Sequence, residues 1–123
     1  MILNEDSGIS DYHIKAYQPG AITINTSAYT NSLIVSAHTL IPHWAPRSLD
    51  ELQDEHFRPI LNLNPQIVLL GTGVTFKMPR TKQIAPLYKQ KLGVECMDTG
   101  AACRTYTALI AEGRNVVAAL LIS

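Results

Sequence analysis

The chain has 123 residues, of which 46% are hydrophobic and 16% charged, and ten Lys and Arg balance ten Asp and Glu to a formal net charge of +0. This balance excludes an overall field that would draw the protein to nucleic acid or to an anionic membrane, so we expect no nucleic-acid partner. The length predicts a single domain at residues 12–123, preceded by a flexible N-terminus at residues 1–11.

The chain shows no membrane or export segment. No window reaches the roughly 18 consecutive apolar residues that a membrane-spanning helix needs. Residues 1–11 lack the basic region and long apolar run of a secretory signal. We therefore expect a cytoplasmic protein without membrane insertion. The two cysteines, Cys96 and Cys103, do not form a CxxC motif, which favours reduced core thiols over a redox pair.

The first part of the chain predicts an antiparallel β segment. Apolar and polar residues alternate at 14–17 and at 21–25, and Pro19-Gly20 between them favours a turn. The run at 32–37 predicts another strand, and residues 39–44 a short one. Exposed strand edges and low charge together favour weak homo-oligomerisation.

A helix is predicted from Ser48 to about Arg58. The sequence Ser-Leu-Asp-Glu at 48–51 has the form of a capping box. Pro59 cannot continue a helix without losing a hydrogen bond, so the helix should end before it. Its apolar face would contain Leu49, Leu52, His56 and Phe57.

The last two thirds of the chain alternate between helix and strand. The predicted elements are a strand at 66–70, a helix within 81–92 that Gly93 stops, a strand at 94–98, a helix from 99 or 100 to about 113, and a strand at 115–122. Pro86 fits the first turn of a short helix or kinks a longer one. The strand at 66–70 is apolar throughout, which is typical of a parallel strand buried on both faces. Together these patterns predict a three-layer α/β domain with a mixed, partly parallel central sheet.

The helix after residue 98 has one apolar face. At 100° per residue, this face holds Ala102, Tyr106, Leu109 and Ile110, and the opposite face holds Arg104, Thr107, Ala108 and Ala111. Tyr106 is therefore expected to be a core aromatic residue rather than a catalytic phenol. For Arg104, a partner surface, an ion pair with a distant carboxylate and simple solvation all stay open.

Two stretches of the sequence carry a family resemblance. One is Leu-Gly-Thr-Gly at 70–73, and the other is Gly-Val-Glu-Cys-Met-Asp-Thr-Gly-Ala-Ala-Cys-Arg-Thr-Tyr at 93–106, with Phe76 and Pro79 between them and Glu-Gly-Arg at 112–114 after them. In this order the residues resemble the MTH-nine-three-eight-like family, which was first catalogued as a domain of unknown function and includes a mitochondrial assembly factor for respiratory complex I. The resemblance implies a three-layer α/β domain with a mixed sheet and implies no activity. Thr107 departs from the family, which typically has Asn there.

A candidate binding site lies where two predicted strands end. Ligands of open α/β sheets sit beyond the carboxyl ends of the strands. If the two strands are neighbours, their loops form one crevice, where free backbone N–H groups at the helix start can bind an anion. Alternatively, the glycines only make tight turns and Asp98 or Thr99 only caps the helix. The candidate residues are Gly71, Thr72, Gly73, Asp98, Thr99, Gly100 and Arg104.

The sequence contains few other residues that could form a metal, cofactor or catalytic site. The four histidines lack the spacing of metal ligands, and Gly-Thr-Gly lacks the rest of a nucleotide-binding loop, so we expect no metal and no cofactor. Glu112 and Arg114 are expected to pair locally or to tie loops together. The aromatic residues Trp44, Phe57 and Phe76 predict core packing, although Trp44, between prolines, could instead be an exposed anchor for a partner.

These observations favour a non-enzymatic protein-interaction or assembly factor with a protein partner, linked by the family resemblance to respiratory-complex assembly. The alternative is an enzyme, or a small-molecule or anion binder, that uses the crevice at Gly71–Gly73 and Asp98–Gly100. A polar pocket enclosed at the strand ends would favour this alternative. A filled junction would favour the interaction protein.

Overall fold

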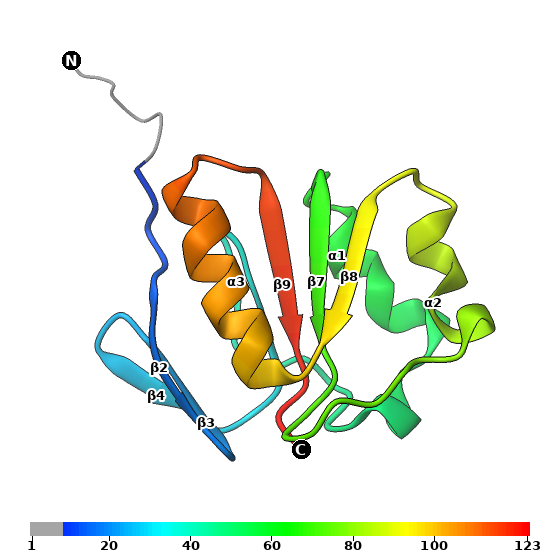
Figure 1. The fold of residues 1–123 in the computed structure, drawn as a ribbon, viewed down its shortest axis with the longest axis horizontal. Coiled ribbons are helices and arrows are strands. Elements are labelled where there is room, and N and C mark those ends of the chain that lie inside the picture. The colour runs from blue at the N-terminus through cyan, green and yellow to red at the C-terminus, as the bar shows by residue number, and fades with distance from the viewer. Residues whose placement is uncertain (1–8) are drawn as a thin grey trace.

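The computed structural model describes residues 9–123 and places them in two sheets and the helices around them (Figure 1). Most of the predicted flexible N-terminus, residues 1–8, lies outside the described residues. Asp11, which the sequence places in that flexible part, is attached to the domain. Its backbone N–H donates to the Ala37 carbonyl oxygen at 2.7 Å, and its own carbonyl oxygen accepts from the Asn25 side chain at 2.9 Å.

The central sheet has five strands in the order β6-β5-β9-β7-β8. Strands β7, β8 and β9 are parallel, whereas β5 is antiparallel to β9 and β6 is antiparallel to β5. The predicted mixed, partly parallel central sheet is therefore confirmed. The strands are β5 (Leu33–Val35), β6 (Leu40–Ile41), β7 (Ile67–Gly71), β8 (Gly93–Met97) and β9 (Val116–Leu120).

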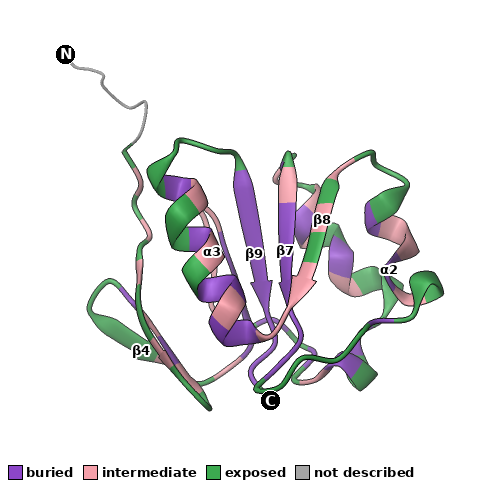
Figure 2. Cartoon of the chain, in the orientation of Figure 1, coloured by how far each residue is buried: buried purple, intermediate pink, exposed green. Residues whose placement is uncertain are grey.

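Strands β7 and β9 lie in the middle of this sheet and are buried on both faces (Figure 2). Because side chains alternate along a strand, β9 contributes to two separate cores. Val116 and Ala118 pack on the α3 side, and Val117 and Ala119 pack on the other side. The continuous apolar run at 66–70 therefore gives the buried parallel strand that its pattern predicts.

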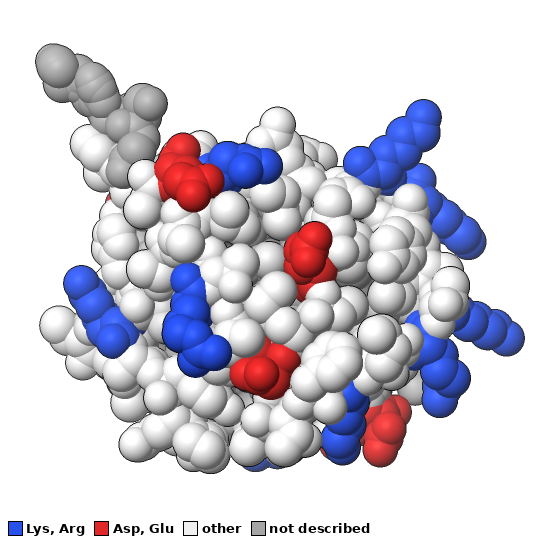
Figure 3. All heavy atoms as spheres, viewed as in Figure 1, with Lys and Arg blue, Asp and Glu red and all other residues white. Residues whose placement is uncertain are grey.

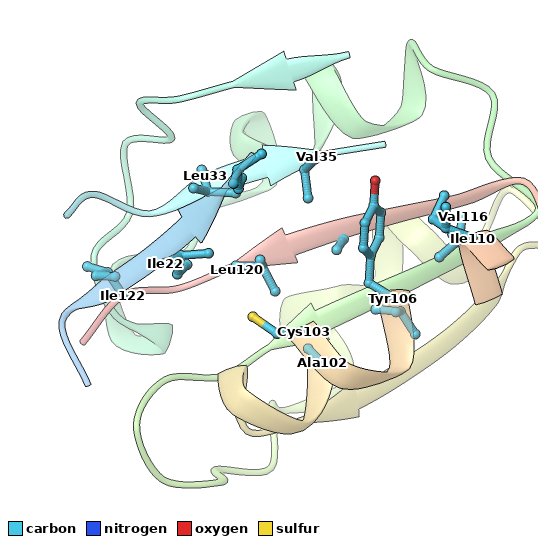
Figure 4. Packing of buried hydrophobic residues seen from close by; sticks show 13 residues of the cluster. Ile22, Leu33, Val35, Ala102, Cys103, Tyr106, Ile110, Val116, Leu120 and Ile122 are labelled. Carbon is cyan, nitrogen blue, oxygen red and sulfur yellow. The ribbon is translucent and has the colours of Figure 1, made fainter. Parts of the chain in front are cut away.

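One face of the central sheet is covered by helix α3 (Thr99–Ala111) and by a three-stranded antiparallel sheet (Figure 1). The strands of this small sheet are β2 (Ile14–Gln18), β3 (Ala21–Ile24) and β4 (Ser27–Tyr29). The predicted face of α3 is correct, since Ala102, Tyr106 and Ile110 are buried against the sheet (Figure 4). The Tyr106 hydroxyl donates to the Tyr12 carbonyl oxygen at 3.0 Å, which joins the helix to the segment before β2.

The other face is covered by two 3-10 turns, η1 (Leu49–Glu51) and η2 (Asp54–Phe57), and by the helices α1 (Arg58–Leu61) and α2 (Thr81–Tyr88). Trp44 and Phe57 belong to this core. The indole Nε1 of Trp44 donates to the His56 carbonyl oxygen at 3.0 Å, and only 5% of the residue is exposed. Core packing of Trp44 is therefore confirmed, and the exposed anchor is wrong.

The single helix predicted from Ser48 to Arg58 is wrong. The Ser48 side chain makes no capping bond, and the Glu51 carboxylate instead accepts from the Arg47 backbone N–H at 2.9 Å. Pro59 lies in the first turn of helix α1, which begins at Arg58, rather than ending a helix. The physical reason is that the first turn of a helix needs no backbone N–H, so a proline can start a helix as well as stop one.

Two other predicted boundaries differ from the structure. Gly93 is the first residue of β8 and not a helix stop, because Lys91 takes the left-handed conformation after α2, at φ 58°. The strand predicted at 39–44 shrinks to the two residues of β6. Of the two positions predicted for Pro86, the first turn of a short helix is wrong, because Pro86 lies inside the longer helix α2.

Candidate functional site

The strand-end junction, formed by residues 71–73 and 98–100, joins two neighbouring parallel strands as the sequence interpretation requires. The two loops are bonded directly to each other. The Thr72 backbone N–H donates to the Met97 carbonyl oxygen at 2.8 Å, and the Thr99 backbone N–H donates to the Gly73 carbonyl oxygen at 2.8 Å. Two backbone N–H groups and two backbone carbonyl groups at this junction therefore satisfy one another.

The Thr99 side chain fills the centre of the strand-end junction. Its hydroxyl donates to the Leu121 carbonyl oxygen at 2.7 Å and accepts from the Gly73 backbone N–H at 3.0 Å. Gly71 makes room for this side chain, since a Cβ there would lie 2.8 Å from Thr99 Oγ1. At Gly73, whose φ is 122°, a Cβ would collide with the Ser123 carbonyl oxygen. Both glycines are thus required by close backbone packing.

The expected row of free N–H groups at the start of α3 is not found. The Thr99 N–H is bonded to Gly73, and the Asp98 carboxylate caps the helix by accepting from the Ala101 N–H at 2.8 Å. A capping side chain offers the helix end the same interaction that an anion would. Two of the donors that the sequence interpretation assigned to an anion are therefore used within the protein.

A cavity of about 410 Å³ lies between β2 and α3, next to Gly100, the residue that follows Thr99. We call it the β2–α3 cavity. Two predicted site residues, Gly100 and Arg104, line it together with Lys15, Tyr17, Cys103 and Thr107. A Cβ at Gly100 would lie 3.2 Å from the Tyr17 ring, so the glycine lets this ring pack against the first turn of the helix.

Arg104 and Lys15 are both exposed, and they give the β2–α3 cavity two positive charges. Figure 3 shows one basic side chain over α3 and another over the small sheet. Within residues 9–123, no carboxylate lies within ion-pair distance of Arg104. Of the alternatives for this residue, the ion pair with a distant carboxylate is therefore not found among residues 9–123.

Burial raises the pKa of two ionisable groups in the wall of this cavity. It raises the pKa of the Cys103 thiol to about 12, an effect that the Arg104 charge partly opposes and the Asp98 charge increases. Burial also raises the pKa of Tyr17, with smaller contributions from Cys103 and Asp98. Because the thiolate is the nucleophilic form of cysteine, Cys103 is inert near neutral pH. The wall can hold a ligand but offers no activated nucleophile there.

Tyr17 has one further property. Within residues 9–123, its hydroxyl is the buried side-chain polar atom that lacks a hydrogen-bond partner. Neither Tyr17 nor Lys15 was identified from the sequence. The alternation around residues 14–17 predicts their strand, but no local pattern places that strand against a helix that begins more than eighty residues later.

The other side chains considered in the sequence analysis have surroundings that indicate structural roles. Burial raises the pKa of Tyr106, whose hydroxyl is bonded to Tyr12, as expected of a core phenol. Arg114 pairs with Glu112 at 4.0 Å, which confirms the predicted local pair. Cys96 and Cys103 are free thiols. In the described part of the chain, no three His, Cys, Asp or Glu side chains are grouped as metal ligands.

A second surface feature lies at residues 74–91, which we call the basic apolar segment. Phe76 was predicted to be a core residue, but it is 48% exposed, because the loop between β7 and α2 runs over the surface. No Asp or Glu occurs from residue 56 to residue 94. Most basic side chains on the face shown in Figure 3 lie on the α2 side. The exposed apolar residues are Val74, Phe76, Met78 and Tyr88, and the basic residues are Lys77, Arg80, Lys82, Lys89 and Lys91.

These features define an α/β protein with a filled strand-end junction and an open cavity between its small sheet and its longest described helix. The chain belongs to the family described as "Protein of unknown function (DUF498/DUF598)", which matches residues 14–121. The solution structure of a Bordetella pertussis protein, titled an MTH-nine-three-eight-like domain, is 26% identical with a TM-score of 0.78, and the match covers 99% of this chain and 92% of that one. The family resemblance drawn from the sequence is therefore confirmed.

Two further relatives have names that state a location or a role. The "13 kDa major membrane protein" of Francisella tularensis is 32% identical over 119 residues, which cover 94% of this chain and 95% of that protein. The "NADH dehydrogenase [ubiquinone] 1 alpha subcomplex assembly factor 3" of Danio rerio is 29% identical over 110 residues, or 88% of this chain and 63% of that protein. Within residues 9–123, no helix has both the length and the apolar character to cross a bilayer.

Proposed function

We propose that this protein is a non-enzymatic interaction or assembly factor, and that it binds an acidic surface of a partner protein through the basic apolar segment. The exposure of large apolar side chains in this segment carries the proposal. Met78 is 74% exposed, and Val74, Phe76 and Tyr88 are 44–50% exposed. Apolar side chains next to basic ones are typical of a surface that a partner covers.

The charges of the segment indicate the kind of partner. Its five basic residues are not balanced by any acidic residue between 56 and 94, although the whole chain has a net charge of +0. Positive potential on one side of a neutral protein favours encounter with a negatively charged patch. The expected partner is therefore a protein with an acidic surface around an apolar centre.

Two observations favour this role over the alternative of an enzyme or anion binder at the strand ends. The Thr99 side chain fills the strand-end junction, and the buried Cys103 thiol stays protonated near neutral pH. The zebrafish relative is named as an assembly factor for NADH dehydrogenase, which supports the proposal that this chain assists assembly of a respiratory complex. A cytoplasmic location and weak self-association through β6 and β8, the outer strands of the central sheet within residues 9–123, stay predictions.

The test is complementation of a strain that lacks the gene, with assembled NADH dehydrogenase measured on native gels. We expect the wild-type protein to restore the complex and the variant Phe76→Ser/Met78→Ser to fail while keeping its melting temperature. Ile9→Ser is the matched control, because Ile9 is 56% exposed and lies outside the segment. Normal assembly in the deletion strain would reject the respiratory role, and full activity of the double variant would reject this surface.

A further inference from the structure

The β2–α3 cavity has the properties of a ligand site that is separate from the basic apolar segment. Its volume of about 410 Å³ falls within the range of about 300–1,000 Å³ that is usual for small-molecule pockets. We propose that this cavity binds a small organic carboxylate with an apolar body. The proposal does not depend on the partner-binding role.

The charge around the cavity favours an anion with a single negative charge. Lys15 and Arg104 line the cavity, and none of the lining residues is acidic. Asp98 is the nearby counter-charge, because its carboxylate caps α3 and lies beside Gly100, and its charge raises the pKa of both Tyr17 and Cys103. Two positive charges and one negative charge leave a local excess of one positive charge. A carboxylate neutralises this excess, and the planar guanidinium of Arg104 can bind its two oxygens together.

The remaining wall favours an apolar body on that carboxylate. Ile14, Ala16 and the Tyr17 ring line the β2 side, and Gly100 lines the helix side. Thr107 uses its hydroxyl within the helix, where it donates to the Cys103 carbonyl oxygen at 3.2 Å. The charged recognition is therefore concentrated at Lys15 and Arg104. Apart from the Tyr17 hydroxyl, which lacks a hydrogen-bond partner within residues 9–123, the other contacts are suited to hydrocarbon.

The cavity is also formed in advance. Tyr17 packs closely on Gly100, and the bond from Tyr106 to Tyr12 holds the start of β2 beside α3. A preformed site loses little conformational freedom when a ligand binds. Binding should therefore shift signals around the cavity without rearranging the fold.

The test is a titration with octanoate, followed by two-dimensional NMR of the backbone amides. We expect the largest shifts at residues 14–17 and 100–107. The variant Lys15→Ala/Arg104→Ala should weaken binding at least about tenfold, which corresponds to about 1.4 kcal/mol. The matched control is Arg47→Ala/Arg58→Ala, which removes two positive charges from exposed positions outside both the cavity and the basic apolar segment and should bind octanoate as the wild type does.

Two comparison probes complete the test. Octanamide keeps the apolar body without the charge, and acetate keeps the charge without the body, so each should bind at least about tenfold more weakly than octanoate. Equal binding of octanamide would overturn the role of Lys15 and Arg104, and equal binding of acetate would overturn the apolar body. Absence of shifts around the cavity, or shifts that the control variant also loses, would overturn the site itself.

Discussion

The strand-end junction and the β2–α3 cavity share one turn, residues 98–100, and yet one is filled and the other is open. At the junction, the Thr99 side chain satisfies the Gly73 N–H and the Leu121 carbonyl group. At the cavity, the next residue is Gly100, whose missing side chain lets the Tyr17 ring pack against the helix and form the cavity wall. Successive helical residues point about 100° apart, so neighbours in sequence serve different surroundings. A polar side chain at a strand end can therefore bind a ligand only when it is not already hydrogen-bonded to neighbouring backbone groups.

The largest effect is expected at Cys103, which lies between the cavity and the core and is only 3% exposed. Burial raises its pKa from 9.0 to about 12. Between these values the unfolded chain releases the thiol proton while the folded chain keeps it, so stability should fall as the pH rises. At about 1.36 kcal/mol per pKa unit, the loss reaches about 4 kcal/mol.

Urea unfolding under reducing conditions, from about pH 8 to about pH 12, measures this loss. Cys103→Ala is the control, because burial raises the pKa of Tyr17 and Tyr106 in both proteins, and the variant removes only the smaller contribution of Cys103 to the pKa of Tyr17. The wild type should lose stability more steeply than the variant. If the wild type and Cys103→Ala lose stability equally as the pH rises, water reaches the Cys103 thiol through the cavity. The thiol would then not lie in a closed core, and the contrast between the open cavity and the closed core would be wrong.

The second-largest effect is expected at Thr99, which fills the strand-end junction. Thr99→Val keeps the shape of the side chain but leaves the Gly73 N–H without its acceptor and the Leu121 carbonyl without its donor. Two buried groups without partners should lower the free energy of unfolding by about 3 kcal/mol. Thr107→Val is the matched control and should stay within about 0.5 kcal/mol, because Thr107 is exposed. Chemical denaturation measures both, and a loss below about 1 kcal/mol at Thr99 would show that the junction is hydrated.

The smallest effect concerns Arg104 on the open side. Because this residue is exposed, Arg104→Ala should change stability by no more than about 0.5 kcal/mol. Removal of one member of a buried ion pair would instead cost about 3–5 kcal/mol. Thermal unfolding separates the two cases, and a large fall in melting temperature would contradict the surface position of Arg104.

Much of the fold could be predicted because its signals are local. The apolar run at 66–70 and the 3.6-residue pattern of α3 each specify burial directly, and both are found as expected. The region at 48–61 could not be predicted in the same way. Ser-x-x-Glu and Pro59 each have two structural uses, and the choice between them depends on packing against the sheet.

The candidate site could be predicted only in part. Gly100 and Arg104 line a cavity, but their partners Lys15 and Tyr17 come from a strand near the other end of the sequence. The pattern at 71–73 correctly marks a tight turn, but it does not show that Thr99 occupies the space beside Gly71. Such long-range register is set by tertiary packing, which a local pattern does not record. The exposure of Phe76 is a similar case, since an aromatic residue in a loop is core or surface according to the path of that loop.

The position of β9 in the central sheet affects the order in which the chain can fold during synthesis. Strands β5 and β7 are not paired with each other, because β9, at residues 116–120, lies between them. On the ribosome, both strands emerge long before the strand that joins them. Until it arrives, each has a free apolar edge of the kind that pairs with other chains. Completion of the sheet therefore waits for almost the whole of the described sequence, and a chaperone that shields these edges would have the most effect during this interval.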